Sequence, residues 1–504
     1  VLVGVGQFAE RFEDDGYRAL SAVDLAAEAA RAAIADTGAD PDAVAARIHT
    51  VAGVRQFEIS VPGMPVPLGK SDNFPRSVAD RIGADPANAV LEIVGGQSPQ
   101  KLVTEFAAAI AAGETDAVLL FGAEAISTAR HFSGKPDAPD FNEERGGQLE
   151  DRGYGIEGLV TMAMVKHGLV DTVSQYGLFE NARRARLGLG RQHYAAQMGE
   201  LFAPFSRIAS KNPYSSSTNV YEADELVNVT ERNRMIADPY PRLLVARDQV
   251  NQGAAVLLTS VEVAHELGVP EDRWVFLHGH ADMTEHHLLE RPDLSSGPAS
   301  VVAANHALEV AGIGVDDLDM LDIYSCYPIA VFNISDALGL AADDPRGLTV
   351  TGGLPYFGGA GNNYSMHGIA EVVTRLREKP GSFGFVGANG GMLSKYSVGI
   401  YSTTPVGWRP NRSAELQAEL DTAATVPLTE EPNGEGTIET FSIRYDGDRR
   451  TAVVLGRLPD GSRFLGKNAE GETELVDFLL GEHPFGQTVH VVAGEWGNTV
   501  SLPA

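Results

Sequence analysis

The sequence contains one cysteine, Cys326, within the stretch Asp322-Ile323-Tyr324-Ser325-Cys326-Tyr327-Pro328. An apolar run precedes it and predicts a strand over 320–325, and the residues that follow predict a helix over 329–340. The thiol is therefore expected at a strand-to-helix turn. A cysteine in such a place is a nucleophile, an acid/base, or a small buried apolar side chain, and the residues around it must decide which.

Two glycine-rich loops belong with this turn. One spans 351–367 and runs into a predicted helix at 369–377, and the other spans 385–392 between two predicted strands. Such loops bring backbone N–H groups close to a ligand carbonyl or phosphate, although tight turns that need glycine explain each of them equally well. The candidate binding residues in them are Gly358, Gly359, Asn362, Asn389 and Gly390.

Strands and helices alternate along the chain. Strands are predicted at 1–5, 48–54, 89–94, 117–121, 254–260, 274–279 and 320–325, with helices at 24–37, 101–112 and 300–311. This alternation is typical of an α/β fold and predicts a largely parallel sheet covered on both faces. Ligands bind at the carboxyl ends of strands in such sheets, where both the Gly95-Gly96 loop and Tyr324 are expected.

The second part of the chain repeats a pattern from the first. Residues 33–43 and 307–318 each combine a helix end, a small-residue or glycine turn, an acidic pair and then an apolar residue. We interpret the two halves as a fused duplication.

Composition shifts divide the chain further. Residues 131–247 are rich in charged and aromatic side chains and are expected to form an inserted loop or lid domain. Residues 405–436 are expected to form a linker. Short alternating runs from 437 onwards, with a helix near 473–480, predict a small five-stranded β-barrel of the OB type. The predicted units are 1–130, 131–247, 248–404, 405–436 and 437–504.

The bulk properties exclude several function classes. The chain has 504 residues and a formal net charge of -29, which disfavours binding to nucleic acid or to an anionic membrane. No run approaches 18 apolar residues, and the first residues are typical of a strand rather than a signal peptide, so we expect no membrane insertion and a cytoplasmic protein. No CxxC or HExxH signature is present, and no metal site is predicted.

In this order, the three loops resemble those of the thiolase superfamily over residues 1–404, most closely those of the sterol-carrier-protein-type thiolases. That family's Gly-Gly-Leu…Gly-His-Pro…Ala-Glu pattern runs without gaps from Gly352 to Glu371, and Tyr324 to Tyr327 stand at its His-Asp-Cys-Phe motif. The C-terminal barrel resembles the addition carried by actinobacterial thiolase-like proteins of type 1. The resemblance implies a duplicated fold with α/β/α/β/α layers.

Most catalytic residues of the family are replaced in this sequence. Gly96, 26 residues before Gly122, stands where the family has its nucleophilic cysteine. Gly359 replaces the activating histidine of Gly-His-Pro, and Tyr324 replaces the histidine of the second motif. Cys326 alone matches, at an acid/base position. The resemblance therefore implies no conventional thiolase turnover, since a Claisen condensation needs a thiolate to carry the acyl group.

Three functions stay open. The first is handling of acyl-CoA thioesters in lipid or sterol metabolism by a relative of acetyl-CoA acetyltransferase, with coenzyme A as a ligand and no covalently bound cofactor. The second is a retro-aldolase acting on acyl-CoA, with Tyr324 and either Tyr356 or Tyr364 as acid and base. The third is a non-catalytic scaffold subunit.

We expect a monomer or a homodimer that pairs through the core sheet, and a protein partner at the C-terminal barrel. Three further residues are left with a structural explanation beside a functional one. His367 either packs or caps its helix or faces the site, and Lys395 and Tyr396 are expected as surface residues of a strand.

Overall fold

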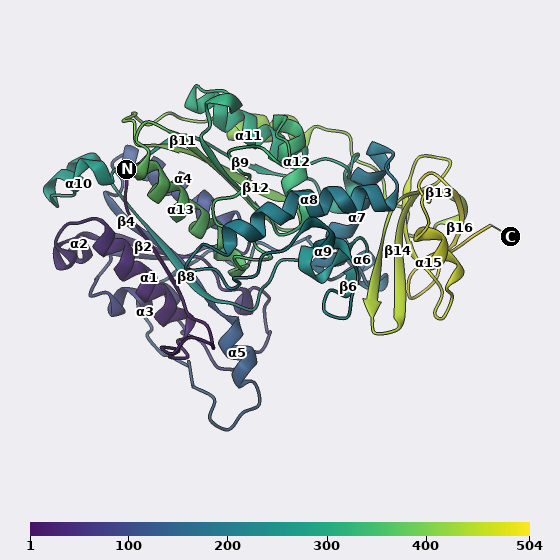
Figure 1. Cartoon of the computed structure of the whole chain (residues 1–504), viewed down its shortest axis with the longest axis horizontal. Coiled ribbons are helices and arrows are strands. Elements are labelled where there is room, and N and C mark those ends of the chain that lie inside the picture. Colours follow the sequence, from purple (N-terminus) through teal and green to yellow (C-terminus); the bar gives the residue numbers. More distant parts are fainter. Residues whose placement is uncertain (504) are drawn as a thin grey trace.

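The computed structural model describes residues 1–503 and places a two-sheet core beside a small barrel at the carboxyl-terminal end (Figure 1). The first sheet has the strand order β1-β8-β4-β2-β3-β5 and the second the order β10-β11-β12-β9. Their bounds are β1 Leu2–Ala9, β2 Thr50–Gly53, β3 Asn88–Leu91, β4 Ala117–Ala125, β5 Glu150–Asp151, β8 Asn251–Thr259, β9 Phe276–Thr284, β10 Met320–Ile323, β11 Phe383–Gly390 and β12 Lys395–Ser402.

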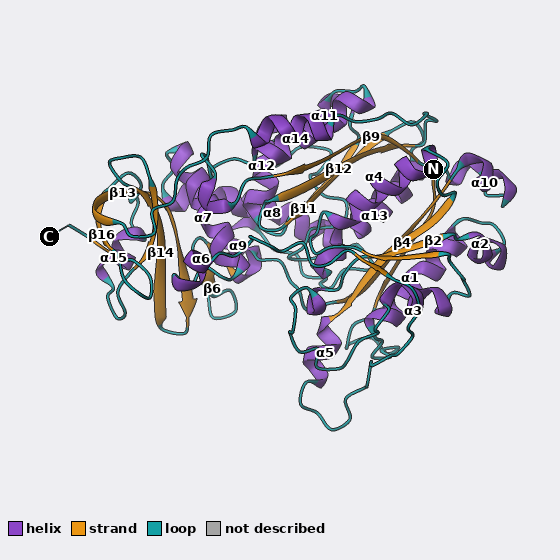
Figure 2. Ribbon diagram, turned by 180° about the vertical axis from the view of Figure 1, so that it is seen from behind, coloured by secondary structure: helices purple, strands orange, loops and turns teal. Residues whose placement is uncertain are grey.

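Helices form three layers around the two sheets, which gives the expected α/β/α/β/α arrangement (Figure 2). The helices α1 (Ala22–Asp36) and α3 (Phe74–Arg81) cover the outer face of the first sheet. Between the sheets lie α4 (Ser98–Ala111) and α13 (Tyr364–Glu378), whose apolar side chains form one core with both inner faces. On the far face of the second sheet lie α11 (Pro298–Ala311), α12 (Pro328–Leu338) and α14 (Ser413–Asp421).

The predicted duplication is visible in the strand order. The series β1-β8-β4-β2 corresponds to β9-β12-β11-β10, and in both series the successive pairings are antiparallel, antiparallel and parallel. The helices α1 and α11, whose ends carry the repeated sequence pattern, pack on equivalent strand pairs. The two halves therefore share one topology.

Three predictions about the core are wrong in detail. The sheets are mixed rather than largely parallel, because each half returns through an antiparallel strand. Strand β8, predicted to open the second half at 248, completes the first sheet between β1 and β4. The glycine loop predicted at 385–392 is mostly strand β11, since its small residues allow helices α4 and α13 to approach closely.

The inserted segment is helical rather than loop-like. It contains α6 (Met162–Lys166), α7 (Thr172–Leu187), α8 (Arg191–Ala209) and α9 (Ala223–Val227). The Asp171 side chain caps α7 by accepting from Ser174 N at 2.7 Å, and Gly188 ends it at a φ of 63°. The segment predicted as a linker, 405–436, likewise contains α14.

The predicted barrel is confirmed. Its strands are β13 (Asn433–Asp446), β14 (Arg449–Arg457), β15 (Arg463–Lys467), β16 (Thr488–Val492) and β17 (Thr499–Ser501), with α15 (Glu474–Leu479) near the predicted helix. Alternating apolar side chains form a separate core inside it. The barrel sheet continues into the insertion through β6 (Met235–Ala237) and β7 (Tyr240–Pro241). The remaining elements are α2 (Pro41–Arg47), α5 (Ile126–Phe132) and α10 (Val261–Glu266).

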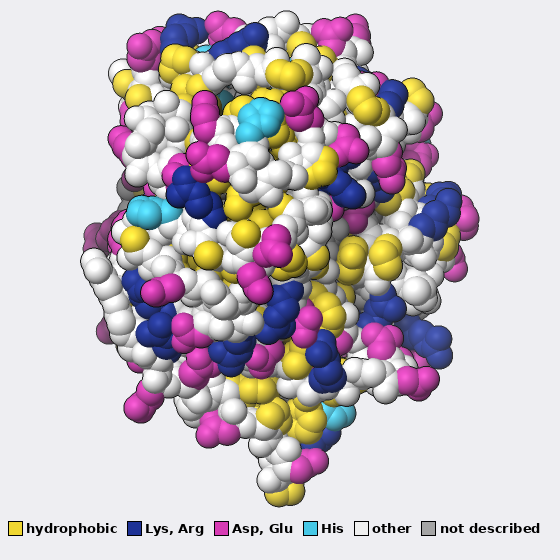
Figure 3. Space-filling view, turned by 90° about the vertical axis from the view of Figure 1, so that its left-hand side faces the viewer, with side chains coloured by type: hydrophobic (Ala, Val, Ile, Leu, Met, Phe, Trp, Pro, Cys, Tyr) yellow, Lys and Arg dark blue, Asp and Glu magenta, His cyan; other side chains and the backbone are white. Residues whose placement is uncertain are grey.

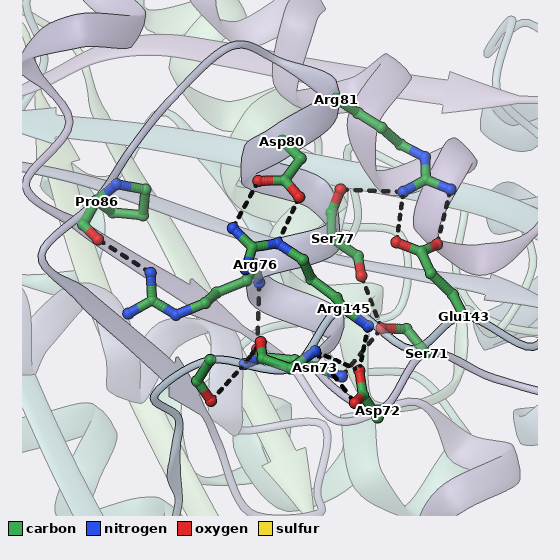
Figure 4. Close-up of polar contacts among 12 residues, drawn as sticks. Ser71, Asp72, Asn73, Arg76, Ser77, Asp80, Arg81, Pro86, Glu143 and Arg145 are labelled. Atoms are coloured by element: carbon green, nitrogen blue, oxygen red, sulfur yellow. Dashed lines mark hydrogen bonds and ion pairs between the residues drawn. The ribbon is translucent and has the colours of Figure 1, made fainter.

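The end of the molecule away from the barrel carries a long loop that leads to β5. Figure 4 shows how ion pairs and hydrogen bonds fix this loop on α3: Arg145 binds Asp80, and Arg81 donates to Glu143 Oε2 at 2.9 Å. Asp72 accepts from the backbone N of Arg145 at 2.8 Å. On this end of the molecule, Figure 3 shows acidic and basic side chains intermixed with apolar ones. None of the helices within residues 1–503 has the length and apolar character needed to cross a bilayer.

Candidate functional site

Cys326 lies between the carboxyl end of β10 and the start of α12, as predicted, and is buried. Because β10 and β11 are parallel neighbours, their ends meet, and the Asn389 Nδ2 lies 3.8 Å from Cys326 Sγ. Burial raises the pKa of the Cys326 thiol to about 12, against which the facing Tyr176 and Asn389 side chains act only weakly. The thiol is therefore neutral near pH 7 and is a weak hydrogen-bond donor rather than a nucleophile.

The Tyr324 side chain lies directly against Gly96. A Cβ atom on Gly96 would lie 2.6 Å from Tyr324 Cζ, 2.6 Å from the Asn389 carbonyl oxygen, and closer still to the Tyr324 hydroxyl. The Tyr324 ring therefore fills the volume that a side chain at position 96 would need. Burial raises the Tyr324 pKa well above its usual range, and no other residue of the described chain is hydrogen-bonded to its hydroxyl. The hydroxyl is a neutral donor without an internal acceptor.

Gln97 fills the neighbouring gap between Gly95 and Gly390. Its Oε1 lies where a Cβ of either glycine would be placed, so both positions need glycine for this close approach. The Gln97 Oε1, the Asn389 Oδ1 and the Tyr396 hydroxyl are buried without a hydrogen-bond partner in residues 1–503. Buried polar atoms are seldom left unpaired, so a concentration of them around one cysteine indicates a place that receives a polar ligand or water.

The other glycine and asparagine candidates hold the loops together. The Asn362 Oδ1 accepts from Gly95 N at 3.0 Å, and its Nδ2 donates to Arg55 O at 2.8 Å and Ser60 Oγ at 3.0 Å. Gly358 has a φ of 124°, and a Cβ there would meet Val250 Cγ1 at 2.7 Å. These two candidates have structural roles in the described chain.

Gly359 also lies in a close backbone contact. Its N donates to Arg247 O at 2.7 Å, and Ala246 N donates to Cys326 O at 3.0 Å. Residues 246 and 247 therefore run between the cysteine turn and the glycine loop, and they connect both.

The buried carboxylate of Asp322 fixes the loop that begins at residue 349. It accepts from the backbone N of Val350 and Thr351, each at 3.0 Å, and from the Thr349 hydroxyl at 3.0 Å. The Tyr364 hydroxyl also donates to it, at 3.2 Å. Tyr364 is thus engaged by Asp322 rather than free, while its ring packs edge-on against Tyr324 at 5.4 Å between centroids.

Helix α7 of the insertion supplies side chains that the sequence did not single out as functional. The Tyr176 hydroxyl accepts from Asn389 Nδ2 at 2.8 Å, and its ring stacks on Tyr327 at 4.2 Å. Glu180 accepts from Ile329 N at the start of α12 at 2.8 Å and from the Tyr240 hydroxyl at 2.8 Å. Burial raises the Glu180 pKa to about 7 despite these donors. Tyr176 appears in the sequence only as one of many aromatic residues, and no local pattern distinguishes Glu180.

Three remaining candidates lie around the site. The His367 Nδ1 is 2.7 Å from Gln7 Oε1, and burial lowers its pKa to about 3, so it is a neutral packing residue between α13 and β1. The expectation of surface positions for Lys395 and Tyr396 is wrong: Tyr396 is buried, and the half-buried Lys395 ammonium donates to Val94 O at 3.3 Å. Burial lowers the Lys395 pKa.

A pocket of about 360 Å³ opens on the other side of the 246–247 segment. It is lined by Arg11 and Arg247, by the acidic residues Glu10, Glu13 and Asp14, by Gln252 and by the hydroxyl-rich run 215–218, among others. Arg247 is exposed and Gln252 Oε1 is buried without a partner in the described residues. The pocket therefore carries charges of both signs, and Arg247 is its exposed cation next to the cysteine turn. Within residues 1–503 no group of three or more His, Cys, Asp and Glu side chains is arranged to hold a metal.

Known proteins are similar to both parts of the chain. Residues 415–495 match the family model described as the thiolase-like protein type 1 additional C-terminal domain. The crystal structure of a monomeric SCP2-thiolase like protein type 1 from Mycobacterium smegmatis is 53% identical, covers 100% of this chain and 98% of its own, and has a TM-score of 0.86. This similarity confirms the predicted fold and the resemblance on which it rested.

More distant similarities extend to enzymes. An acetyl-CoA acetyltransferase from Chromobacterium violaceum is 25% identical over 357 residues, which are 65% of this chain and 83% of that protein. The structure of the Ltp2-ChsH2(DUF35) aldolase has a TM-score of 0.58 at 20% identity and covers 80% of this chain and 97% of its own, a likeness of fold alone.

Proposed function

Because the chain belongs to the SCP2-thiolase-like protein type 1 family, we propose that it binds the thioester end of an acyl-CoA non-covalently in the altered thiolase site. The observation that carries this proposal is the group of buried, unpartnered polar atoms around Cys326: Gln97 Oε1, Asn389 Oδ1 and the Tyr396 hydroxyl, together with the free Tyr324 hydroxyl. A pantetheine arm ends in amides and a thioester, which match such donors and acceptors.

The charges of the site agree with binding rather than acyl transfer. The thiol of Cys326 and the hydroxyl of Tyr324 are both neutral near pH 7, because burial raises the pKa of each. Gly96 offers no nucleophile. Neutral donors stabilise a thioester carbonyl without attacking it, so the acyl–sulfur bond stays intact.

The residues present also fit the charged end of coenzyme A. In a chain of net charge -29, phosphates need a local cationic group, and Arg247 is exposed and free of ion pairs within residues 1–503. The Arg247 carbonyl oxygen accepts a hydrogen bond from Gly359 N. The N–H group of the preceding residue, Ala246, donates to the Cys326 carbonyl oxygen. In this proposal Arg247 holds the phosphates, while Tyr324 donates to the thioester carbonyl.

Titration calorimetry with acetyl-CoA and with free CoA tests the two contacts separately. Tyr324→Phe should weaken acetyl-CoA binding about threefold to tenfold and leave CoA binding unchanged, because only the thioester offers the carbonyl. Arg247→Ala should weaken both ligands, whereas Arg232→Ala, which removes another exposed arginine, should weaken neither. Absence of heat with both ligands at millimolar concentration contradicts the proposal.

One observation favours the retro-aldolase as a second candidate. The Tyr324 hydroxyl has no internal acceptor, so it is free to deliver a proton to an enolate formed by carbon–carbon cleavage. Release of a ketone or aldehyde from a β-hydroxyacyl-CoA, lost in Tyr324→Phe, would support this activity. Equal release by both proteins would remove Tyr324 from such a mechanism.

A further inference from the structure

A groove lies between helix α6 and the C-terminal barrel, and none of its lining residues belongs to the thiolase site. It has a volume of about 420 Å³ and is lined by residues 162, 163, 166 and 167 at α6, by the segment 428–431 and Leu465, and by residues 493–495, 497 and 498 of the loop between β16 and β17. Figure 1 shows α6 beside the barrel. The groove is therefore formed by the insertion and the barrel together.

Hydrogen bonds across the base make the groove rigid. The His167 Nε2 accepts from Asn498 N at 2.7 Å, and the Asn498 Nδ2 donates to Leu465 O at 2.9 Å. The Lys467 ammonium donates to Lys166 O at 2.8 Å and to Trp496 O at 3.0 Å. The loop that carries Trp496 is thus held against α6 by several bonds, and binding there needs little ordering of the chain.

Met162 lines the groove, and two further large apolar side chains, Val165 and Trp496, are exposed on the elements that form it. Trp496 is 77% exposed, Met162 68% and Val165 49%. Met162 and Val165 are three residues apart on α6 and share a face. Tryptophan and methionine are enriched in the centres of protein interfaces, and tryptophan is a frequent anchor of binding energy. Of the two other tryptophans, Trp274 is buried and Trp408 stacks on His280.

The charges along the groove have one dominant sign. Glu430, Glu431 and Glu495 line it, are exposed, and form no ion pair in the described part of the chain. Lys166 is the one opposing charge in the lining, since burial lowers the pKa of His167 and keeps it neutral. A partner with Lys or Arg beside an apolar side chain complements this surface, whereas nucleic acid and anionic lipid are repelled.

From this combination we propose that the groove is a docking site for a basic and apolar segment of a partner protein. An apolar side chain of that segment packs against Trp496 and Met162, and its Lys or Arg side chains pair with the three glutamates. The proposal goes beyond thioester binding and does not depend on it.

Trp496 provides the readout for a direct test. The probe is a synthetic 15-residue peptide of lysine and leucine in helical spacing, without aromatic residues, compared with its glutamate–leucine counterpart. The lysine peptide should shift the tryptophan emission of the full chain to shorter wavelength and bind saturably. The triple variant Glu430→Gln, Glu431→Gln, Glu495→Gln should bind it about tenfold more weakly.

Matched variants separate the groove from the general negative charge of the chain. Glu114→Gln with Glu144→Gln removes two exposed, unpaired carboxylates on the N-terminal half and should leave binding unchanged. Trp496→Ala should abolish the emission shift and weaken binding measured by calorimetry, without changing the melting temperature. Equal weakening in the two sets of variants overturns the proposal.

Other occupants give different results. Concentration-dependent self-association that disappears in Trp496→Ala would assign the groove to a second copy of this chain. Binding of phosphatidylserine vesicles or single-stranded DNA with a Trp496 emission shift would assign it to a lipid surface or nucleic acid. Each of these outcomes overturns a basic protein segment as the partner.

Discussion

Gly96 and Tyr324 are in contact, so the side chain allowed at either position depends on the side chain at the other. A side chain at 96 would collide with the tyrosine ring and with the Asn389 carbonyl. Restoring a cysteine at 96 therefore does not restore a reactive pair. The same contact directs the Tyr324 hydroxyl at the space beside Gly96, where the proposed thioester carbonyl would lie.

Gly96→Cys should destabilise the chain by about 1–3 kcal/mol, because overpacking forces the Tyr324 ring or the Asn389 backbone to move. Gly96→Cys combined with Tyr324→Ala should be less destabilised than the sum of the two single variants, as measured by urea unfolding in a double-mutant cycle. Gly407→Cys, at a glycine with open space around it, is the control and should cost little. Simple additivity of the two changes would show that the contact carries no energy.

The Cys326 thiol should be almost unreactive in the folded chain. With a pKa of about 12, roughly one part in ten thousand is thiolate at pH 8, so a thiol reagent should react about a thousandfold more slowly than in the unfolded chain. If the thiol reagent releases a chromophore when it reacts, the absorbance reports Cys326 alone, because Cys326 is the only cysteine. Rapid reaction at pH 8 without denaturant would contradict a buried, neutral thiol.

At the scale of elements, helix α7 positions the turn that carries Cys326. Its Tyr176 and Glu180 side chains contact the Asn389 side chain and the first turn of α12. A carboxyl oxygen at a helix N-terminus stabilises that helix by accepting from a free backbone N–H group, here that of Ile329. The insertion therefore builds one wall of the site.

The raised pKa of Glu180 predicts a pH dependence of stability. In the unfolded chain the carboxyl ionises near pH 4.5, whereas in the folded chain it stays protonated until about pH 7. Its contribution to the free energy of unfolding is thus fully present below pH 4.5 and is lost as the pH rises to 7, by up to about 3 kcal/mol. Glu180→Gln should have a flatter melting-temperature profile over this window than Glu200→Gln on the neighbouring helix. Parallel profiles would rule out Glu180 as the titrating group.

The sequence predicts some elements far better than others, for physical reasons. Barrel strands such as β14 and β16 alternate polar and apolar residues between clear turns, and this alternation predicts them as strands. No helical pattern predicts α7, because it buries polar residues such as Gln175, Asn181 and Arg184 as well as apolar ones, which removes the helical period. The sequence order places β8 in the second half, but its strand partners β1 and β4 lie more than a hundred residues away and belong to the first sheet.

The candidate site was predicted only in part. Loop order and motif spacing bring Gly96, Tyr324, Cys326 and Asn389 together, and the structure places Gly96 against Tyr324 and Asn389 and places Asn389 beside Cys326. The sequence cannot show that the Asn362 side chain is hydrogen-bonded to the neighbouring loops rather than free for a ligand. Nor can it show that α7 contacts the Asn389 side chain beside Cys326. Those facts depend on tertiary packing, which no local pattern records.

At the scale of the whole molecule, the free edge of the first sheet is covered. Strand β5 pairs in parallel with β3, and Asp151 in it is bound by Arg55. Arg152 joins Glu92, Glu105 and Glu150 beside it. A second copy therefore finds no unpaired β3 edge, and a segment of the insertion rather than the barrel blocks that surface.

We expect a monomer in light scattering coupled to gel filtration, at concentrations from 1 to about 100 µM, because sheet-to-sheet pairing through β3 is blocked. Arg152→Ala should loosen β5 and speed amide exchange in β3 and β5, compared with Arg207→Ala at a surface pair elsewhere. A stable dimer of the unaltered chain would mean that another face associates.

The barrel and the insertion share one sheet, so neither can be removed without affecting the other. Strand β13 pairs with β6, Thr440 Oγ1 donates to Leu178 O at 2.6 Å, and Asn181 Nδ2 donates to Phe441 O at 3.0 Å. A gene truncated after residue 436 would leave Asn181 and the carbonyl of Leu178 without these partners. Loss of the barrel would therefore expose buried polar groups of the insertion, and we expect the insertion to need compensating substitutions in any shortened chain.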